Sequence, residues 1–261
     1  MKLSSANINV MVKACRKASK TLIRDFGEIE NLQVSIKGPG DFVTASDKKV
    51  EKILIDELQK ARPNYSIISE EIGKINNDDS SKWIIDPIDG TANFLHGIPH
   101  FAISIGLEQD GEIICGIIYD PIKDEMFIAE KGNGAYLNNQ RIRVSSRSNL
   151  KNCIIFTGGP KKESQNIELS LKEYNNFSSK VLIPIRKLGS AALDMAYVAA
   201  GRCDGFWQRN LSYWDIAAGI ILVKEAGGFI TDFKGNNEYI ENKTILVTNS
   251  RINKEMIELL K

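Results

Sequence analysis

The sequence contains little that would support histidine, thiol or membrane chemistry. It has only two histidines, His96 and His100, so reactions that need several histidines are nearly excluded. Its four cysteines are far apart and form no Cys-x-x-Cys pair, which favours buried, reduced thiols over a structural zinc site. The N-terminus has no long apolar run, so we expect no signal peptide, no membrane span and a cytoplasmic location.

An excess of charge of either sign is also absent. The chain has 34 basic and 33 acidic residues, a formal net charge of +1, so we expect no broad attraction to nucleic acid or to a membrane surface. We find no internal repeat and no low-complexity tract. With 261 residues, 43% of them hydrophobic and 26% charged, the chain is long enough for one large domain or two closely packed halves.

Apolar periodicity divides the chain into an α+β half, residues 1–150, and an α/β half, residues 151–261, which together form one compact unit. The polar segment 145–152 is the best internal boundary. In the first half we predict helices at about 7–26 and from about 47, and strands at about 65–69, 83–85, 101–108, 112–120 and 124–131, the last three as an antiparallel meander. In the second half we predict strands near 153–157, 181–185, 204–207, 229–231 and 244–247, and helices near 163–174, 189–200, 214–226 and 251–260.

The most informative motif is Asp86-Pro87-Ile88-Asp89-Gly90-Thr91, directly after a short apolar run. Because Pro87 cannot donate to a sheet, we expect the strand to stop at Asp86. A tight turn would bring both carboxylates and the carbonyl of Ile88 within reach of one hard cation. The commoner use of such a segment is an Asx turn that caps a helix, and the segment alone does not decide between the two.

Further carboxylates fall at the ends of predicted elements: Asp47, Glu70, Glu71 and Asp215. Asp47 and Asp215 are also explained as N-terminal helix caps. Glu70 and Glu71 are consecutive at a strand end and point to opposite faces, so we expect only one of them to be a ligand. A crowded carboxylate set repels itself unless cations neutralise it, and oxygen ligands favour magnesium or manganese over zinc.

Four segments, in this order, resemble the inositol monophosphatase family, and its bacterial members in particular: Glu70-Glu71, the Asp86–Thr91 motif, Trp214-Asp215 and Glu225-Ala226-Gly227-Gly228. The order and spacing match over essentially the whole chain, from Lys37 and Asp47 to the final helix. The resemblance implies a layered αβαβα sandwich of the inositol monophosphatase and fructose-1,6-bisphosphatase type. It also implies a magnesium-dependent, lithium-sensitive phosphatase that forms a homodimer.

The resemblance also implies a role for each motif residue. Glu70, Asp86 and the Ile88 carbonyl would hold one cation. Asp86, Asp89 and Asp215 would hold a second, and Glu70 would help to bind a weaker third. The cations would be Mg²⁺, with Mn²⁺ as a possible substitute.

The catalytic residues implied in the same way are Thr91, Glu70 and Asp47. Thr91, supported by the two carboxylates, would position and activate the attacking water. The amides of Gly90 and Thr91 would bind the phosphate at a helix start, where anions commonly bind.

The residues expected to contact the substrate are Asp89, Gly90, Thr91, Gly189, Ser190, Ala191, Gln208 and Asp215. The segment 189–191 fits a family motif that contacts the alcohol, although a capped helix explains it as well. The family commonly has a glutamate seven residues before Asp215, where this chain has Gln208. A neutral amide there leaves the metal chemistry intact and argues against a cationic amino-alcohol phosphate.

We therefore expect a phosphatase for myo-inositol monophosphate or a similar polyol or sugar monophosphate. Histidinol phosphate, a nucleoside 3′-phosphate and fructose bisphosphate remain alternative substrates. Bacterial members of the family are also implicated in antitermination complexes, so a regulatory contact with RNA polymerase is a hypothesis from another class. The complete carboxylate set favours retained catalysis, because a pure binding protein would not need it.

Overall fold

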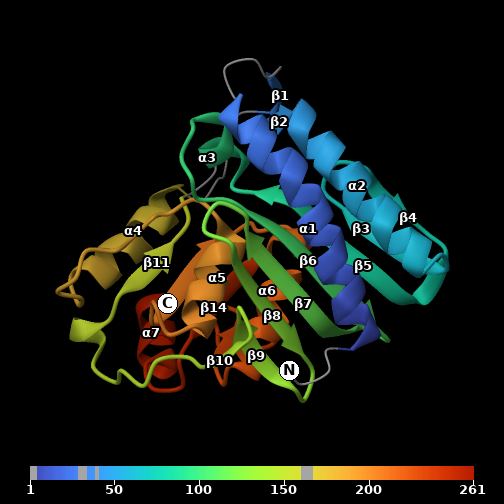
Figure 1. The fold of residues 1–261 in the computed structure, drawn as a ribbon. Helices are drawn as coiled ribbons and strands as arrows, with labels where there is room; N and C mark the ends of the chain where they lie inside the picture. The colour runs from blue at the N-terminus through green and yellow to red at the C-terminus, as the bar shows by residue number, and fades with distance from the viewer. Residues whose placement is uncertain (1–4, 29–33, 39–40, 160–166) are drawn as a thin grey trace.

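The computed structural model describes residues 5–28, 34–38, 41–159 and 167–261 (Figure 1). Its largest element is an eight-stranded sheet with the strand order β10-β9-β8-β7-β6-β5-β3-β4. Neighbouring strands are antiparallel except β3 and β5, which are parallel. The strands are β3 (Tyr65–Ser69), β4 (Gly73–Ile75), β5 (Asp78–Asp89), β6 (Ala102–Gln109), β7 (Glu112–Asp120), β8 (Glu125–Glu130), β9 (Gly134–Leu137) and β10 (Gln140–Ile142).

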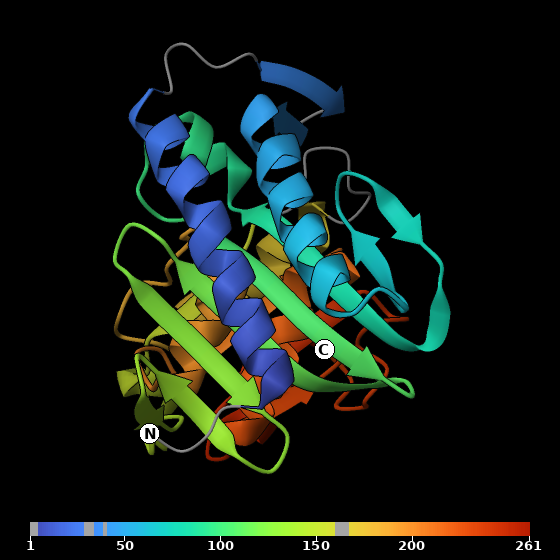
Figure 2. The same ribbon diagram turned by 45° about the vertical axis from the view of Figure 1, so that its right-hand side comes forward.

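Two long helices, α1 (Ala6–Gly27) and α2 (Ala45–Ala61), cross one face of this sheet, as Figure 2 shows. Ser5 caps α1, because its side chain accepts a hydrogen bond from the amide of Ile8 at 3.3 Å. The apolar stripes of both helices are fully buried in one core with Trp83 of the sheet. Between the helices in sequence, β1 (Val34–Gly38) and β2 (Asp41–Thr44) form a separate antiparallel pair.

The opposite face of the large sheet is covered by α6 (Tyr213–Glu225), which also packs on α5 (Ala191–Ala199). Helix α6 lies very close to the sheet: a Cβ added at Gly116 of β7 would be 2.7 Å from the carbonyl oxygen of Ala218. Because α6 has apolar neighbours on nearly every side, its buried residues run without interruption from Ile216 to Val223. This packing brings the first turn of α6 to the end of β5.

A second, four-stranded sheet lies beyond α5 and α6, with the order β11-β12-β14-β13. Its strands are β11 (Ile155–Thr157), β12 (Gly205–Arg209), β13 (Phe229–Thr231) and β14 (Thr244–Thr248), and only β11 and β12 are parallel. Helices α4 (Ile167–Ser178) and α7 (Asn253–Leu259) contact each other, and α7 packs on β14. Three buried cores separate the layers, which confirms the predicted αβαβα sandwich.

Several predicted elements are confirmed and two predictions are wrong. The meander 101–131 and all four helices predicted in the second half are present, although residues 163–166 of the first of these lie outside the described structure. The strand predicted at 181–185 does not form; the nearby chain makes only an isolated bridge between Phe156 and Arg186. The strand predicted to stop at Asp86 continues to Asp89, because the register shifts and accommodates Pro87.

Two short elements complete the description: α3 (Thr91–Leu95), directly after β5, and a 3₁₀ turn at Leu150–Asn152. No helix in the described residues is long and apolar enough to cross a membrane.

Candidate metal centre

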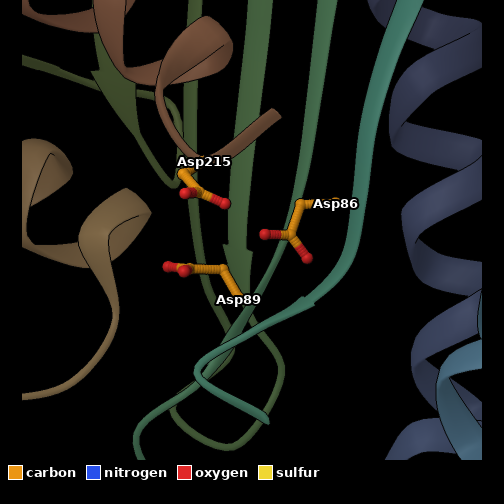
Figure 3. A group of neighbouring side chains, drawn as sticks. All are labelled: Asp86, Asp89 and Asp215. Carbon is orange, nitrogen blue, oxygen red and sulfur yellow. The ribbon is translucent and has the colours of Figure 1, made fainter. Parts of the chain in front are cut away.

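Three carboxylates from two distant parts of the chain meet at one point. Asp86 and Asp89 come from the end of β5 and Asp215 from the first turn of α6, and each offers an oxygen within 4.8 Å of the others. Figure 3 shows the three side chains directed toward a common space. Such an arrangement of oxygen ligands fits a divalent cation of the magnesium type.

The motif's backbone is fixed by its own side chains. Asp86 Oδ1 accepts a hydrogen bond from the amide of Ile88 at 3.0 Å, and Thr91 Oγ1 donates to the carbonyl of Ile88 at 2.8 Å. The Asx-type turn weighed from the sequence is therefore present, but it does not cap α3, whose N-cap position is Gly90. The turn is compatible with a metal site, because it uses one oxygen of Asp86 and leaves the other available.

The N-terminus of α5 holds Asp89. Its Oδ2 accepts hydrogen bonds from the Ser190 hydroxyl and from the amide of Ala192, the latter at 2.8 Å. Asp89 is only 9% exposed, and burial raises its pKa to about 6, although these hydrogen bonds act in the opposite direction. The second oxygen, Oδ1, remains for a cation.

Asp86 is the most strongly perturbed group of the cluster. Burial raises its pKa well above the usual range, and the neighbouring carboxylates raise it further: Glu70, Asp89, Asp215 and Asp47. The structure thus brings four of the carboxylates selected from the sequence close enough to act on Asp86 electrostatically; Glu71 is not among them. Their mutual repulsion without a counter-charge is the physical reason that the donor set fits divalent cations.

Asp215 has two functions in the structure. Its Oδ2 accepts a hydrogen bond from the amide of Ser212 at 2.8 Å at the start of α6, so the helix-cap interpretation is correct. The same carboxylate belongs to the cluster with Asp86 and Asp89.

The turn that carries Glu70 is held by Glu51 of α2, a residue that the sequence analysis missed. Glu51 is 1% exposed, and its Oε1 accepts hydrogen bonds from the Ser69 hydroxyl and from the amides of Glu71 and Ile72 at 3.0 and 3.3 Å. Its sequence signal was obscured because Glu51 lies in the middle of an amphipathic helix and reads there as a surface residue.

A cavity of about 460 Å³ opens beside the carboxylates. It is lined by Glu70, Asp86, Ile88, Asp89, Gly90, Thr91, Ala92, Gly158, Gly159, Gly189, Ser190, Ala191, Asp194, Gln208, Leu211, Ser212, Trp214 and Asp215. Every predicted ligand and substrate residue is in this lining, whereas Asp47 and Glu71 are not. Asp47 is buried behind it, with 1% exposure, in the first turn of α2.

Gln208 of β12 lies on the wall between this cavity and a narrow one of about 30 Å³. Its side chain covers Gly158, where an added Cβ would be 2.0 Å from Gln208 Oε1. In the sequence alone, the neighbouring Gly158 and Gly159 indicate only a turn. In the structure, the lack of a side chain at Gly158 makes room for Gln208. Both glycines line the two cavities.

The two histidines, His96 and His100, are not among the residues that line the cavity. Burial, with a contribution from Lys123, lowers the pKa of His100 to about 4. The side chain of Lys37 lies outside the described part of the structure.

Comparisons with known proteins agree with this geometry. A model of the family described as "Inositol monophosphatase family" matches residues 5–261. The chain is 49% identical over 258 residues to an inositol-1-monophosphatase of Mesorhizobium japonicum, covering 98% of this chain and 97% of the relative. It is 41% identical over 254 residues to the Nus factor SuhB of Escherichia coli, covering 96% of this chain and 94% of that protein.

The fold has a near match among solved structures. The crystal structure of the extragenic suppressor protein SuhB from Bartonella henselae superposes with a TM-score of 0.95 at 51% identity. The match covers 98% of this chain and 99% of that one.

Proposed function

This chain belongs to the inositol monophosphatase family, and we propose that it hydrolyses myo-inositol monophosphate, or a similar polyol or sugar monophosphate, with the help of Mg²⁺. The products are the free alcohol and inorganic phosphate. The observation that carries the proposal is the group Asp86, Asp89 and Asp215, whose oxygens converge beside a cavity large enough for a small phosphate ester.

The donor set supports a resident metal. Glu70, Asp86 and the Ile88 carbonyl would hold one cation, and Asp86, Asp89 and Asp215 a second, with Glu70 helping a weaker third. When bound, the cations would offset the repulsion that raises the pKa of Asp86, make a water more acidic and stabilise the departing oxygen. Manganese has the same preference for oxygen ligands and would substitute.

The hydrogen bond made by Thr91 supports a role for it in orienting the attacking water. Its hydroxyl proton is already donated to the Ile88 carbonyl at 2.8 Å, so its oxygen is left as an acceptor for a hydrogen bond from water. We propose that Thr91 holds the water in line with the phosphorus atom, and that Asp47 and Glu70 support this alignment. The amides of Gly90 and Thr91 line the cavity and would donate to the phosphate oxygens.

The alcohol would be bound by residues 189–191 and Gln208, which line the same cavity. Ser190 is 1% exposed and its hydroxyl donates to Asp89, so its main contribution would be to orient that carboxylate. Ala191 and Gly189 offer backbone atoms on the cavity wall. Gln208 offers one amide that both donates and accepts, which suits neutral hydroxyl groups better than a cationic amine.

A panel of phosphate esters tests this proposal. Phosphate release would be measured with Mg²⁺ for myo-inositol 1-phosphate, glycerol 2-phosphate, histidinol phosphate, a nucleoside 3′-phosphate and fructose 1,6-bisphosphate. We expect the highest kcat/KM for a polyol monophosphate; a strong preference for the phosphonucleotide or the bisphosphate would refute the choice of substrate. Gln208→Glu should raise the relative kcat/KM for histidinol phosphate by about fivefold, because a charged acceptor strengthens a hydrogen bond by about 1 kcal/mol.

A regulatory role is a second proposal, supported by the 41% identity to the Nus factor SuhB. We propose that a surface of this chain binds the transcription machinery independently of catalysis. Capture of RNA polymerase from cell extract by both the wild type and Asp86→Asn would support it. Loss of capture in the inactive variant would contradict the claim of independence.

We make three further proposals: a homodimer, from the family membership, and a cytoplasmic location and a division of the chain at about residue 150, from the sequence pattern. Sedimentation equilibrium tests the first, cell fractionation the second and limited proteolysis near residues 145–152 the third.

A further inference from the structure

We propose that Asn93 is a positioning residue that locks the metal motif to the loop before α5, and thereby orients Asp89. The inference rests on the proposed function only in its claim that this orientation serves cation binding. Asn93 is half-buried in α3 and is not among the residues that line the cavity, so it acts through other groups.

The side-chain amide of Asn93 joins two distant loops. Its Nδ2 donates to the carbonyl of His100 and to the carbonyl of Leu188, both at 2.8 Å. Both N–H groups of the amide are therefore used, each on a backbone acceptor. A carboxylate of the same shape has no N–H to offer, and an aliphatic side chain would leave both carbonyls without this donor.

The loop before α5 and the metal motif approach each other closely at Gly189 and Gly90, so a side chain at either position would crowd its neighbours. A Cβ added at Gly189 would be 2.9 Å from Asn93 Nδ2, and one added at Gly90 would be 3.3 Å from the carbonyl oxygen of Gly189. Both glycines also have positive φ angles, +89° and +99°, which disfavour other residues. The loop before α5 thus lies directly against the metal motif, and Asn93 holds it there.

The joined loop leads at once to Asp89. Ser190 follows Gly189, and its hydroxyl donates to Asp89 Oδ2, as does the amide of Ala192 at 2.8 Å. A closed ring results: the chain runs from Asp89 to Asn93, crosses to Leu188 by a hydrogen bond, and returns through Ser190 to Asp89. A ring of this kind fixes which oxygen of Asp89 faces the space shared with Asp86 and Asp215.

The ring makes a prediction about the metal-free protein. In Asn93→Ala, amide hydrogens of Ala192 and Leu193, which donate to Asp89 and to Ser190, should exchange with solvent on the order of tenfold faster. Asn93→Asp, which keeps the shape and removes the N–H donors, should show the same change. NMR-detected hydrogen exchange would measure both variants.

The matched control is Asn138→Ala. Asn138 also bridges backbone groups with its amide, donating to the carbonyl of Asp124 at 2.8 Å and accepting from the amide of Met126 at 2.9 Å. It lies in the turn between β9 and β10 and is not in the cavity lining. Its loss should lower the Tm while leaving exchange at residues 192–193 unchanged.

Cation binding tests the purpose of the ring. Mn²⁺ titrations followed by electron paramagnetic resonance should show that Asn93→Ala and Asn93→Asp weaken the site that needs Asp89 by roughly 10- to 100-fold. Binding to the site formed by Glu70 and Asp86 should change much less, and Asn138→Ala should bind as the wild type does.

Each outcome decides one part of the inference. Unchanged exchange in both Asn93 variants would overturn the ring, whatever the metal does. Faster exchange with wild-type Mn²⁺ binding would overturn its role in the site. A wild type that binds no Mn²⁺ would instead refute the proposed function and, with it, the purpose of the ring, while the exchange data would still decide whether the ring exists.

Discussion

The substitution Asp89→Asn should stabilise the metal-free protein while it removes a carboxylate that we propose as a cation ligand. Burial raises the pKa of Asp89 from 3.8 to about 6, so the folded state holds the carboxyl proton more tightly than the unfolded chain does. The folded and unfolded pKa values of Asp89 differ by about 2.2, and each pKa unit corresponds to 1.36 kcal/mol. Above pH 6 the carboxylate therefore opposes folding by about 3 kcal/mol. An amide is a neutral mimic of the protonated carboxyl and still accepts from Ala192.

The sign of the pH dependence follows from the same shift. The unfolded carboxyl ionises first, near pH 4, and the folded one near pH 6, so this contribution to stability falls as the pH rises between those values. The stability gap between variant and wild type should be complete at pH 7.5, about half as large at pH 5 and close to zero below pH 4. For a chain of this length, 3 kcal/mol corresponds to roughly 6–12 °C in Tm.

Thermal unfolding in EDTA at pH 7.5 and pH 5 would measure the gap, and saturating Mg²⁺ should raise the Tm of the wild type more than that of the variant. Asp56→Asn, at an exposed position on α2, is the control and should change stability by less than about 0.5 kcal/mol. A variant that melts below the wild type in EDTA at pH 7.5, or a gap that is the same at both pH values, would refute the reasoning.

Three further substitutions or additions test other parts of the site. Glu51→Ala leaves the hydrogen-bond donors of the turn at residues 69–72 without their acceptor. We therefore expect the free energy of unfolding to fall by about 1–3 kcal/mol and the Mg²⁺ concentration for half-maximal rate to rise roughly tenfold. An unchanged Mg²⁺ titration would contradict this expectation. Gly158→Ala should displace Gln208 and raise the KM for a polyol phosphate without changing the Mg²⁺ requirement, and a parallel change in both would argue against a substrate role for Gln208. Lithium should inhibit phosphate release in the presence of Mg²⁺; insensitivity at millimolar LiCl would separate this chain from the family's usual behaviour.

Local periodicity was sufficient to predict most of the elements, and the ends of those elements indicated carboxylates that the fold brings close to Asp86. The meander of β6, β7 and β8 has turn signals at each reversal of the chain. The carboxylates lie at the ends of elements, where polar side chains are not required to pack in the core. The strand predicted at 181–185 does not form: Val181 and Ile185 pack beside α4 and the small sheet without strand pairing and Leu182 is exposed, which a single sequence does not reveal. Pro87 was a misleading stop signal because a register shift can absorb one missing donor.

The supporting residues were beyond the sequence because their signals depend on tertiary contacts. The sequence pattern indicates a helix surface position for Glu51 and a loop position for Asn93. In the structure, both side chains hydrogen-bond to backbone groups near the proposed metal ligands. Gly158 reads as a turn and instead makes room for Gln208. The motif thus predicts which oxygen atoms would bind a cation. The groups that orient those atoms come from distant segments, which only the fold places beside the motif.

Magnesium-dependent phosphate release by the wild type and by Asp86→Asn tests the central claim most directly. Asp86 is 2% exposed and is the carboxylate on which all the others act. We predict that the wild type releases phosphate from myo-inositol 1-phosphate only with Mg²⁺ or Mn²⁺, and that the folded variant loses the activity by at least about 10³-fold. Turnover by the variant at the wild-type rate, or wild-type turnover in excess EDTA, would contradict the account.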